Sequence, residues 1–298
     1  MKYARLTPGA GFLPVHSLLY YGQRVLVAPA LRGPVVRLLA AAVRLRRGLG
    51  AYRCDAPACE RRVQRLRQDG YVALGQLLDA RQIADIRAYL RPRPMIERAG
   101  QARSFTESAV PAGARMAEYS MDDVLACPHV LALANSAPLL ACAQRYIGCK
   151  PTISSLWVRW SFPSTSDSAG LQGYHRDSED WRYLKVLVYL SEVGLDDGPH
   201  AYVLGTHRDR APLRLRQYDD AQIGHLYGTR VVNATGAAGS GFAVDTAGIH
   251  KGTVPAARAR LLLQIQYSLL PAYAYRYAPQ AHPHARAFDP YINRLLIR

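Results

Sequence analysis

The tripeptide His175-Arg176-Asp177 places an imidazole and a carboxylate two positions apart. At the end of an extended strand, side chains at i and i+2 project to the same face, so both groups can reach one metal ion. A second histidine from a later strand would complete a face of two histidines and one carboxylate. Such a face leaves sites open on Fe(II) for a chelating co-substrate and O₂, whereas structural zinc prefers thiolate-rich sites.

The same tripeptide occurs a second time, as His207-Arg208-Asp209. This copy follows Gly205-Thr206 and enters a cationic run that ends at Arg216, so we expect it in a solvated loop. The pattern alone is a weak signal, because nine histidines make chance matches common. The prediction of a metal site at His175 therefore depends on its context in the chain.

Two features downstream supply that context. His250 lies within the segment Asp245–Gly252, and Arg260 follows at the start of a predicted strand. A buried arginine is costly unless it meets an anion, and a dicarboxylate co-substrate would match its fork with two hydrogen bonds. The alternative is that Arg260 lies at a strand edge in water, as exposed as Arg258. Alternation along the strand puts on one face Arg260, Leu262, Gln264 and Gln266.

The sequence from residue 150 onward predicts short β-strands separated by turns, one of them at Asp196-Asp197-Gly198. Short strands with glycine-rich turns and no long helices between them favour a sandwich or barrel over a parallel βαβ sheet. The expected strands are Ile153–Phe162, Tyr183–Leu190, His200–Leu204, Val231–Asn233, Gly241–Asp245 and Leu261–Leu270.

The first half of the chain predicts mostly helices. Within residues 59–90 we expect a helix that Gly70 ends, a strand at Tyr71–Leu74, and a helix at Ala80–Leu90 with a capping box. Residues 122–147 predict two short helices, and residues 95–120 give no assignment.

We expect a helix that spans Val35–Arg47, because Pro34 favours a helix start and Gly48 favours a helix end. The composition of this helix suits two positions, packed on its own domain or lying at a lipid interface.

Several segments, in this order and spacing, resemble the phytanoyl-CoA dioxygenase-like family of Fe(II)/2-oxoglutarate-dependent oxygenases. The resemblance covers roughly residues 60–270, and the segments are jointly far more specific than any one of them. They are Gly70-Tyr71-Val72, Tyr174–Asp177, Tyr183–Leu190, Gly198-Pro199-His200, Val203–His207, and His250-Lys251-Gly252 with Arg260.

The resemblance implies a mainly β fold with flanking helices (α+β) around a double-stranded β-helix, the jelly-roll or cupin-like core. It implies His175, Asp177 and His250 as iron ligands, and Arg260 as the anchor for the distal carboxylate of 2-oxoglutarate. The implied reaction hydroxylates an unactivated C–H bond while 2-oxoglutarate is decarboxylated to succinate. Halogenating relatives replace the carboxylate ligand with a small residue, so the presence of Asp177 favours hydroxylation.

Five further residues are candidates for the site. Lys185 either reaches the co-substrate or forms an ion pair at the barrel mouth. Family members often carry Ser or Thr two residues after the distal histidine; Gly252 stands there, and Thr253 is the candidate to substitute. The side chains that flank the expected site either shape a substrate pocket or belong to the core, and they are Trp157, Arg159 and Trp181.

The charge is strongly positive and unevenly placed. Lys and Arg number 38 against 22 Asp and Glu, a net charge of +16, and the first 50 residues contain no acidic side chain. This basic end suggests attraction to an anionic surface, with a merely solvated face as the alternative. Five cysteines without a C-x-x-C pair indicate a reducing cytoplasm, and charges and prolines interrupt the most apolar stretch. We therefore expect a cytoplasmic protein, with possible peripheral contact at the inner membrane face through residues 1–50.

These observations predict three parts: a basic, partly helical segment at 1–55, the oxygenase domain with its N-terminal helices at 56–272, and a Tyr-rich tail at 273–298. The expected substrate is small or linked to a lipid or glycan, and anionic. The competing interpretations are a non-catalytic jelly-roll binding module and a basic protein associated with membrane or nucleic acid. A nucleic-acid partner is disfavoured, because no zinc-finger or RNP-type motif occurs and the charge is concentrated outside the core. A zinc hydrolase is last, because no general-base Glu accompanies the ligands.

Overall fold

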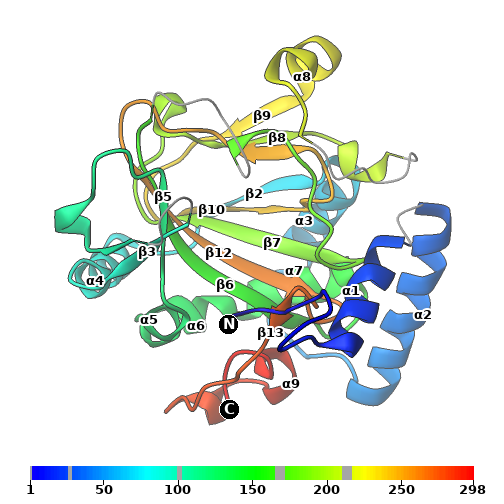
Figure 1. Cartoon of the computed structure of the whole chain (residues 1–298). Coiled ribbons are helices and arrows are strands. Elements are labelled where there is room, and N and C mark those ends of the chain that lie inside the picture. Colours follow the sequence, from blue (N-terminus) through cyan, green and yellow to red (C-terminus); the bar gives the residue numbers. More distant parts are fainter. Residues whose placement is uncertain (1, 26–28, 99–102, 165–171, 210–216) are drawn as a thin grey trace.

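The computed structural model describes residues 2–25, 29–98, 103–164, 172–209 and 217–298 (Figure 1). Its centre is an eight-stranded sheet with strand order β2-β10-β7-β12-β6-β5-β3-β4, in which every neighbouring pair is antiparallel. The strands are β2 (Tyr71–Gln76), β3 (Met95–Glu97), β4 (Ser104–Phe105), β5 (Met116–Tyr119), β6 (Thr152–Ser161), β7 (Tyr183–Tyr189), β10 (Ser240–Val244) and β12 (Arg260–Ser268).

A smaller antiparallel sheet faces the large one across an apolar layer. Its strands β8 (His200–Val203), β9 (Val231–Ala234) and β11 (His250–Gly252) pair in the order β11-β8-β9. Side chains from both sheets meet in one buried cluster that includes Leu187, Tyr202 and Phe242. The two facing sheets confirm the predicted double-stranded β-helix within a mainly β fold with flanking helices (Figure 1).

Helices cover the outer face of the large sheet (Figure 1). They are α3 (Ala56–Asp69), α4 (Ala80–Leu90), α5 (Met121–Ala126), α6 (Val130–Ala134) and α7 (Ala137–Ile147). The ends of two of them confirm the sequence signals: Gly70 ends α3 in a left-handed conformation, and Asp79 with Gln82 forms the capping box of α4. Only glycine fits at residue 70, because a Cβ there would lie 2.1 Å from the Tyr202 hydroxyl.

Strand alternation divides the large sheet into a helix-packed face and an inward face. In β7, Leu184, Val186 and Val188 pack in the helix-covered core, whereas Lys185 and Leu187 point inward. The neighbouring strands β6 and β12 alternate in the same way. Their inward side chains are Trp157, Arg159 and Ser161 in β6 and Arg260, Leu262 and Gln264 in β12. Three residues of the predicted common face of β12, Arg260, Leu262 and Gln264, form one wall of a cavity. The fourth, Gln266, is fully buried farther along the strand and donates to the Ser154 hydroxyl.

The chain ends pack against this core. α1 (Pro14–Val25) and α2 (Pro29–Arg47) lie at one edge of the molecule, dark blue in Figure 1. β1 (Lys2–Tyr3) pairs with β13 (Tyr275–Arg276), and α9 (Pro290–Asn293) buries Ile292 in the core cluster. The division of the chain at residues 55 and 272 stays a prediction.

Three predictions of local structure need correction. α2 begins before Pro34, because burial of Val36 and Ala40 stabilises a helix that tolerates one missing backbone hydrogen bond. Residues 122–147 belong to three helices rather than two: Pro128 lies between α5 and α6, and Pro138 lies in the first turn of α7, where proline is tolerated. In the β-rich half, helix α8 (Asp220–Tyr227) begins where the Asp219 carboxylate caps its first turn.

No helix among the described residues is both long and apolar enough to cross a membrane.

Candidate functional site

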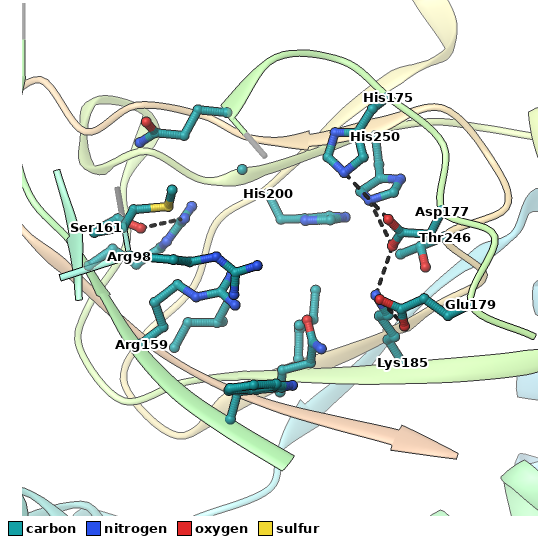
Figure 2. A pocket seen from close by; sticks show the side chains of 18 of the residues that line it. Arg98, Arg159, Ser161, His175, Asp177, Glu179, Lys185, His200, Thr246 and His250 are labelled. Carbon is teal, nitrogen blue, oxygen red and sulfur yellow. Dashed lines mark hydrogen bonds and ion pairs between the residues drawn. The ribbon is translucent and has the colours of Figure 1, made fainter. Parts of the chain in front are cut away.

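His175 and His250 face each other across an isolated antiparallel bridge. The backbone N–H of each donates to the carbonyl oxygen of the other at 2.9 Å, and the two ring centroids lie 4.3 Å apart. The Asp177 carboxylate lies 3.6 Å from Nε2 of His175 and 3.5 Å from Nε2 of His250 (Figure 2). Their ligand atoms lie within 4.8 Å of one another, so the structure brings the three predicted metal ligands together.

Backbone contacts orient both imidazoles. Nδ1 of His175 lies 2.8 Å from the Gly173 carbonyl oxygen, and Nδ1 of His250 lies 3.0 Å from that of Gly248. A carbonyl only accepts, so the proton is assigned to each Nδ1 and the lone pair of each Nε2 points toward Asp177. Nε2 of His175 is buried with no hydrogen-bond partner among the described residues. Two imidazole lone pairs and one carboxylate fit a divalent transition metal.

Lys185 sets the charge state of the carboxylate. Its Nζ lies 2.7 Å from Oδ2 of Asp177 and 3.4 Å from Oε2 of Glu179. Burial alone would raise the pKa of Asp177, but Lys185 and then His250 hold it well below its usual range. The group is therefore an anion at neutral pH. The structure shows the ion-pair alternative for Lys185, and a contact between its ammonium and a co-substrate stays a prediction.

Arg260 is buried, with 5% of its surface exposed, and lines the same cavity as the triad. Its Nη2 donates to the Ser161 hydroxyl at 3.1 Å, while Nε and Nη1 have no partner among the described residues. The alternative of an arginine in water is wrong for Arg260. It fits Arg258, whose side chain is 58% exposed and pairs with Asp197 at 2.7 Å.

A second cationic group lies on the same wall. Arg159 pairs with Glu118 at 2.5 Å, and Arg98 pairs with the same carboxylate. In Figure 2 both guanidinium groups extend into the cavity, with the metal triad on the opposite side. Arg98, Arg159 and Arg260 thus bring three guanidinium groups to the cavity lining, where an anionic group would be stabilised.

Of the other candidates, Trp157 lines the cavity and lies against Tyr275, with ring centroids 6.1 Å apart. The structure does not bring two of them to this cavity. Thr253 is absent from its lining, and its backbone N–H donates to the carbonyl of Pro199. Trp181 lines a different cavity and donates its indole N–H to the Gln23 carbonyl.

Two residues that sequence reasoning did not assign belong to the site. His200 stacks on His250 with a centroid distance of 5.4 Å, and its buried Nε2 has no partner among the described residues. Its place after Gly198-Pro199 at the start of a predicted strand was an available signal. Nothing in the sequence marked Arg98 as a site residue, because it follows the three-residue strand β3 in a region to which the sequence assigned no secondary structure.

The second tripeptide lies outside this cavity, in a 3₁₀ turn at Thr206–Arg208. Nε2 of His207 lies 3.2 Å from the Arg67 carbonyl, and Asp209 pairs with Arg176. Neither residue joins a candidate metal cluster within the described part of the chain. Residues 210–216 of the cationic run lie outside the described residues.

Solved structures share this fold. SnoN, an epimerase in complex with Fe³⁺, α-ketoglutarate and nogalamycin RO, has a TM-score of 0.56 at 20% identity, covering 72% of this chain and 84% of its own. EctD from S. alaskensis has a TM-score of 0.51 at 22% identity, covering 74% and 80%. HygX from Streptomyces hygroscopicus, with nickel and 2-oxoglutarate bound, has a TM-score of 0.50 at 16% identity, and the match covers 78% of this chain and 95% of HygX.

No family model matches the chain, and no curated protein does. The fold is thus the one found in non-heme 2-oxoglutarate-dependent enzymes, and membership of the phytanoyl-CoA dioxygenase-like family stays a prediction.

Proposed function

We propose that this protein is an Fe(II)/2-oxoglutarate-dependent oxygenase that hydroxylates an unactivated C–H bond. One observation carries the proposal: a His-Asp-His triad shares a cavity with a buried arginine that keeps two donors without partners among the described residues. A cation site and an anion site in one cavity match a metal and a dicarboxylate bound side by side.

Each residue would have a distinct role in that reaction. His175, Asp177 and His250 would hold the iron through three of its positions, and Arg260 would receive the distal carboxylate of 2-oxoglutarate in a charge-assisted pair. Bound Fe(II) would supply the chemistry in which O₂ and 2-oxoglutarate oxidise the substrate C–H to C–OH and leave succinate and CO₂. Lys185 would keep Asp177 ionised, and the inward Leu187 and Leu262 would limit access of water.

The substrate proposed is a small or lipid- or glycan-linked molecule with an anionic group. The support for this class is the Arg98–Glu118–Arg159 cluster, which lies on the cavity wall opposite the triad (Figure 2). An acidic group bound there would leave the rest of the molecule directed toward the metal ligands. Residues 56–272 are proposed as the catalytic domain.

The test is O₂-dependent conversion of 2-oxoglutarate to succinate by protein loaded with Fe(II). Asp177→Ala removes one ligand and is expected to lower metal content and turnover by more than about 100-fold. The matched control is Asp209→Ala, the same change in the second tripeptide, which is expected to leave both nearly unchanged. Wild-type protein that binds no iron, or that turns over equally with Asp177→Ala, would favour a non-catalytic binding module instead.

A further inference from the structure

α2 has two apolar faces, and only one of them is buried. Val36 and Ala40 belong to the core cluster, with 3% and 6% of their surface exposed. Leu31, Leu38 and Leu45 follow one another at intervals of seven residues and are 60%, 72% and 90% exposed. Residues seven apart on a helix lie on one face, so the three leucines form a stripe directed away from the core.

α1 lies at the same edge of the molecule as α2 (Figure 1) and carries further exposed apolar side chains. Val15 and Leu18 are 65% and 75% exposed, and Leu19 is 39% exposed. Their spacing of three and four residues places them on one side of α1. We use the name apolar stripe for the exposed apolar residues of both helices together: Val15, Leu18 and Leu19 of α1 and Leu31, Leu38 and Leu45 of α2.

Specific contacts hold both helices so that this stripe stays outside. The buried side-chain amide of Gln23 in α1 donates to Oδ1 of Asp180 at 3.2 Å. The backbone carbonyl of Gln23 accepts a hydrogen bond from the indole N–H of Trp181. On α2, Val36 and Ala40 are buried in the core cluster, and Leu39 and Val43 pack against it. Turning either helix to bury its stripe would break these contacts.

Every charged side chain of α1 and α2 themselves is an arginine. α2 presents exposed Arg37, Arg44, Arg46 and Arg47, and the first acidic residue of the chain is Asp55. An exposed apolar stripe flanked by arginines alone is the pattern of a helix that lies in the interface of an anionic bilayer.

A cationic cavity opens next to α2. It has a volume of about 280 Å³, and its lining includes four arginines from four separate segments of the chain: Arg32 of α2, Arg67 of α3, Arg182 just before β7, and Arg208 of the turn at Thr206–Arg208. Asp245 is the one carboxylate among the described lining residues, and it already accepts from the Tyr146 hydroxyl and the Ala247 N–H. Guanidinium groups in this number, with one engaged carboxylate, suit a phosphate group.

We propose that the α1–α2 edge docks on a bilayer of anionic phospholipid, with the apolar stripe entering the acyl boundary and the cationic cavity binding a headgroup phosphate. A protein partner would need acidic groups to meet the arginines, but a bilayer supplies phosphate and hydrocarbon at adjacent depths. This docking is independent of the iron site.

The test is co-sedimentation of the full chain with vesicles of phosphatidylcholine, alone or mixed with phosphatidylglycerol, at about 0.1 M salt. Retention is expected on the mixed vesicles only. Leu38→Ser with Leu45→Ser is expected to weaken it about tenfold, because two leucines leave the acyl boundary. The matched control pair is Leu195→Ser with Leu226→Ser, two leucines of similar exposure on other elements (68% and 66%), which is expected to change nothing.

A second pair of variants tests the cavity. Arg32→Gln with Arg208→Gln is expected to weaken retention on mixed vesicles by about fivefold per arginine, whereas Arg81→Gln with Arg286→Gln is not. Equal retention on phosphatidylcholine alone, or retention that the leucine pair leaves unchanged, would overturn the proposal. Stabilisation of the protein by inorganic phosphate without any vesicle binding would assign the cavity to a free anion and overturn it also.

Discussion

The chain contains the tripeptide His-Arg-Asp twice, and the fold uses the two copies differently. In the first, His175 and Asp177 point into the cavity and meet His250. In the second, His207 contacts the carbonyl of Arg67 and Asp209 pairs with Arg176. The local sequence is identical, so the difference comes from the strand that each copy faces.

The bridge between His175 and His250 is what makes a metal site from the first copy. It sets two imidazoles opposite each other, and the carbonyls of Gly173 and Gly248 then turn both Nε2 atoms inward. The second copy lies in a 3₁₀ turn with no such partner among the described residues. A two-residue spacing is therefore not sufficient for the proposed metal site, and a third ligand from another strand decides it.

The largest expected difference between the copies is in metal binding. His175→Ala removes one of three ligands, so Fe(II) content and succinate formation are expected to fall more than about 100-fold. His207→Ala removes one contact to a carbonyl and is expected to leave both within about threefold of wild type. Metal analysis and turnover of the purified variants measure the contrast. Equal losses in the two variants would mean that His175 has no special role.

A similar contrast exists between Arg260, the first residue of β12, and Arg258 in the bend just before that strand. Arg260→Gln removes the charge of the buried guanidinium and is expected to weaken 2-oxoglutarate binding by about 100-fold, the range of a lost charge-assisted pair. Arg258→Gln removes a charge that is 58% exposed and is expected to change that affinity less than about twofold. Titration calorimetry of the metal-loaded proteins separates the two. A weak effect at Arg260 would place the co-substrate elsewhere.

The middle residue of each copy predicts a difference in stability. Arg176 donates to the carbonyls of Thr206 and Ala247 and pairs with Asp209, so it ties the second copy to the first. Arg176→Gln is expected to lower the free energy of unfolding by about 2–3 kcal/mol. Arg208→Gln, at an exposed side chain, is expected to stay within about 0.5 kcal/mol. Urea unfolding compares them, and similar midpoints for the two variants would contradict this account of Arg176.

In metal-free protein, the pKa values of His175 and His207 are expected to shift in opposite directions. Burial lowers the pKa of His175, but Asp177 more than offsets this and the net shift is upward. Burial lowers the pKa of His207. His175 thus stabilises the folded protein fully below about pH 6.5, and this contribution is lost as pH rises through its folded pKa. The contribution of His207 is present above about pH 6.5 and is lost as pH falls through its folded pKa. NMR titration of the imidazoles tests the order, and a higher pKa at His207 would reverse it.

The sequence allowed prediction of much of the fold where local chemistry decides structure. Asp79 with Gln82 and Gly70 marked the ends of helices, and alternation from Arg260 identified the inward face of β12. The candidate metal triad was predictable because the two-residue spacing, weak by itself, agreed with a histidine farther along the chain and with a family resemblance. Local signals failed where packing decides: burial of Val36 and Ala40 extends α2 past Pro34.

The sequence could not indicate which cavity a side chain joins where long-range contacts place it. Arg98 reaches the cavity only because β3 pairs with β5, which in turn pairs with β6. Trp181 is close to the triad in sequence, yet its indole bonds to Gln23 of α1 and faces another cavity. Proximity along the chain did not indicate which wall a side chain joins.

The most direct test of the proposed site is to add Fe(II) and 2-oxoglutarate to metal-free protein without oxygen and to record the visible spectrum. A charge-transfer band would report 2-oxoglutarate bound to the iron. The account predicts a band in wild-type protein and in His207→Ala, its loss in His175→Ala, and a weaker band in Arg260→Gln. Folded wild-type protein that gives no band would contradict the assignment of a combined iron and 2-oxoglutarate site.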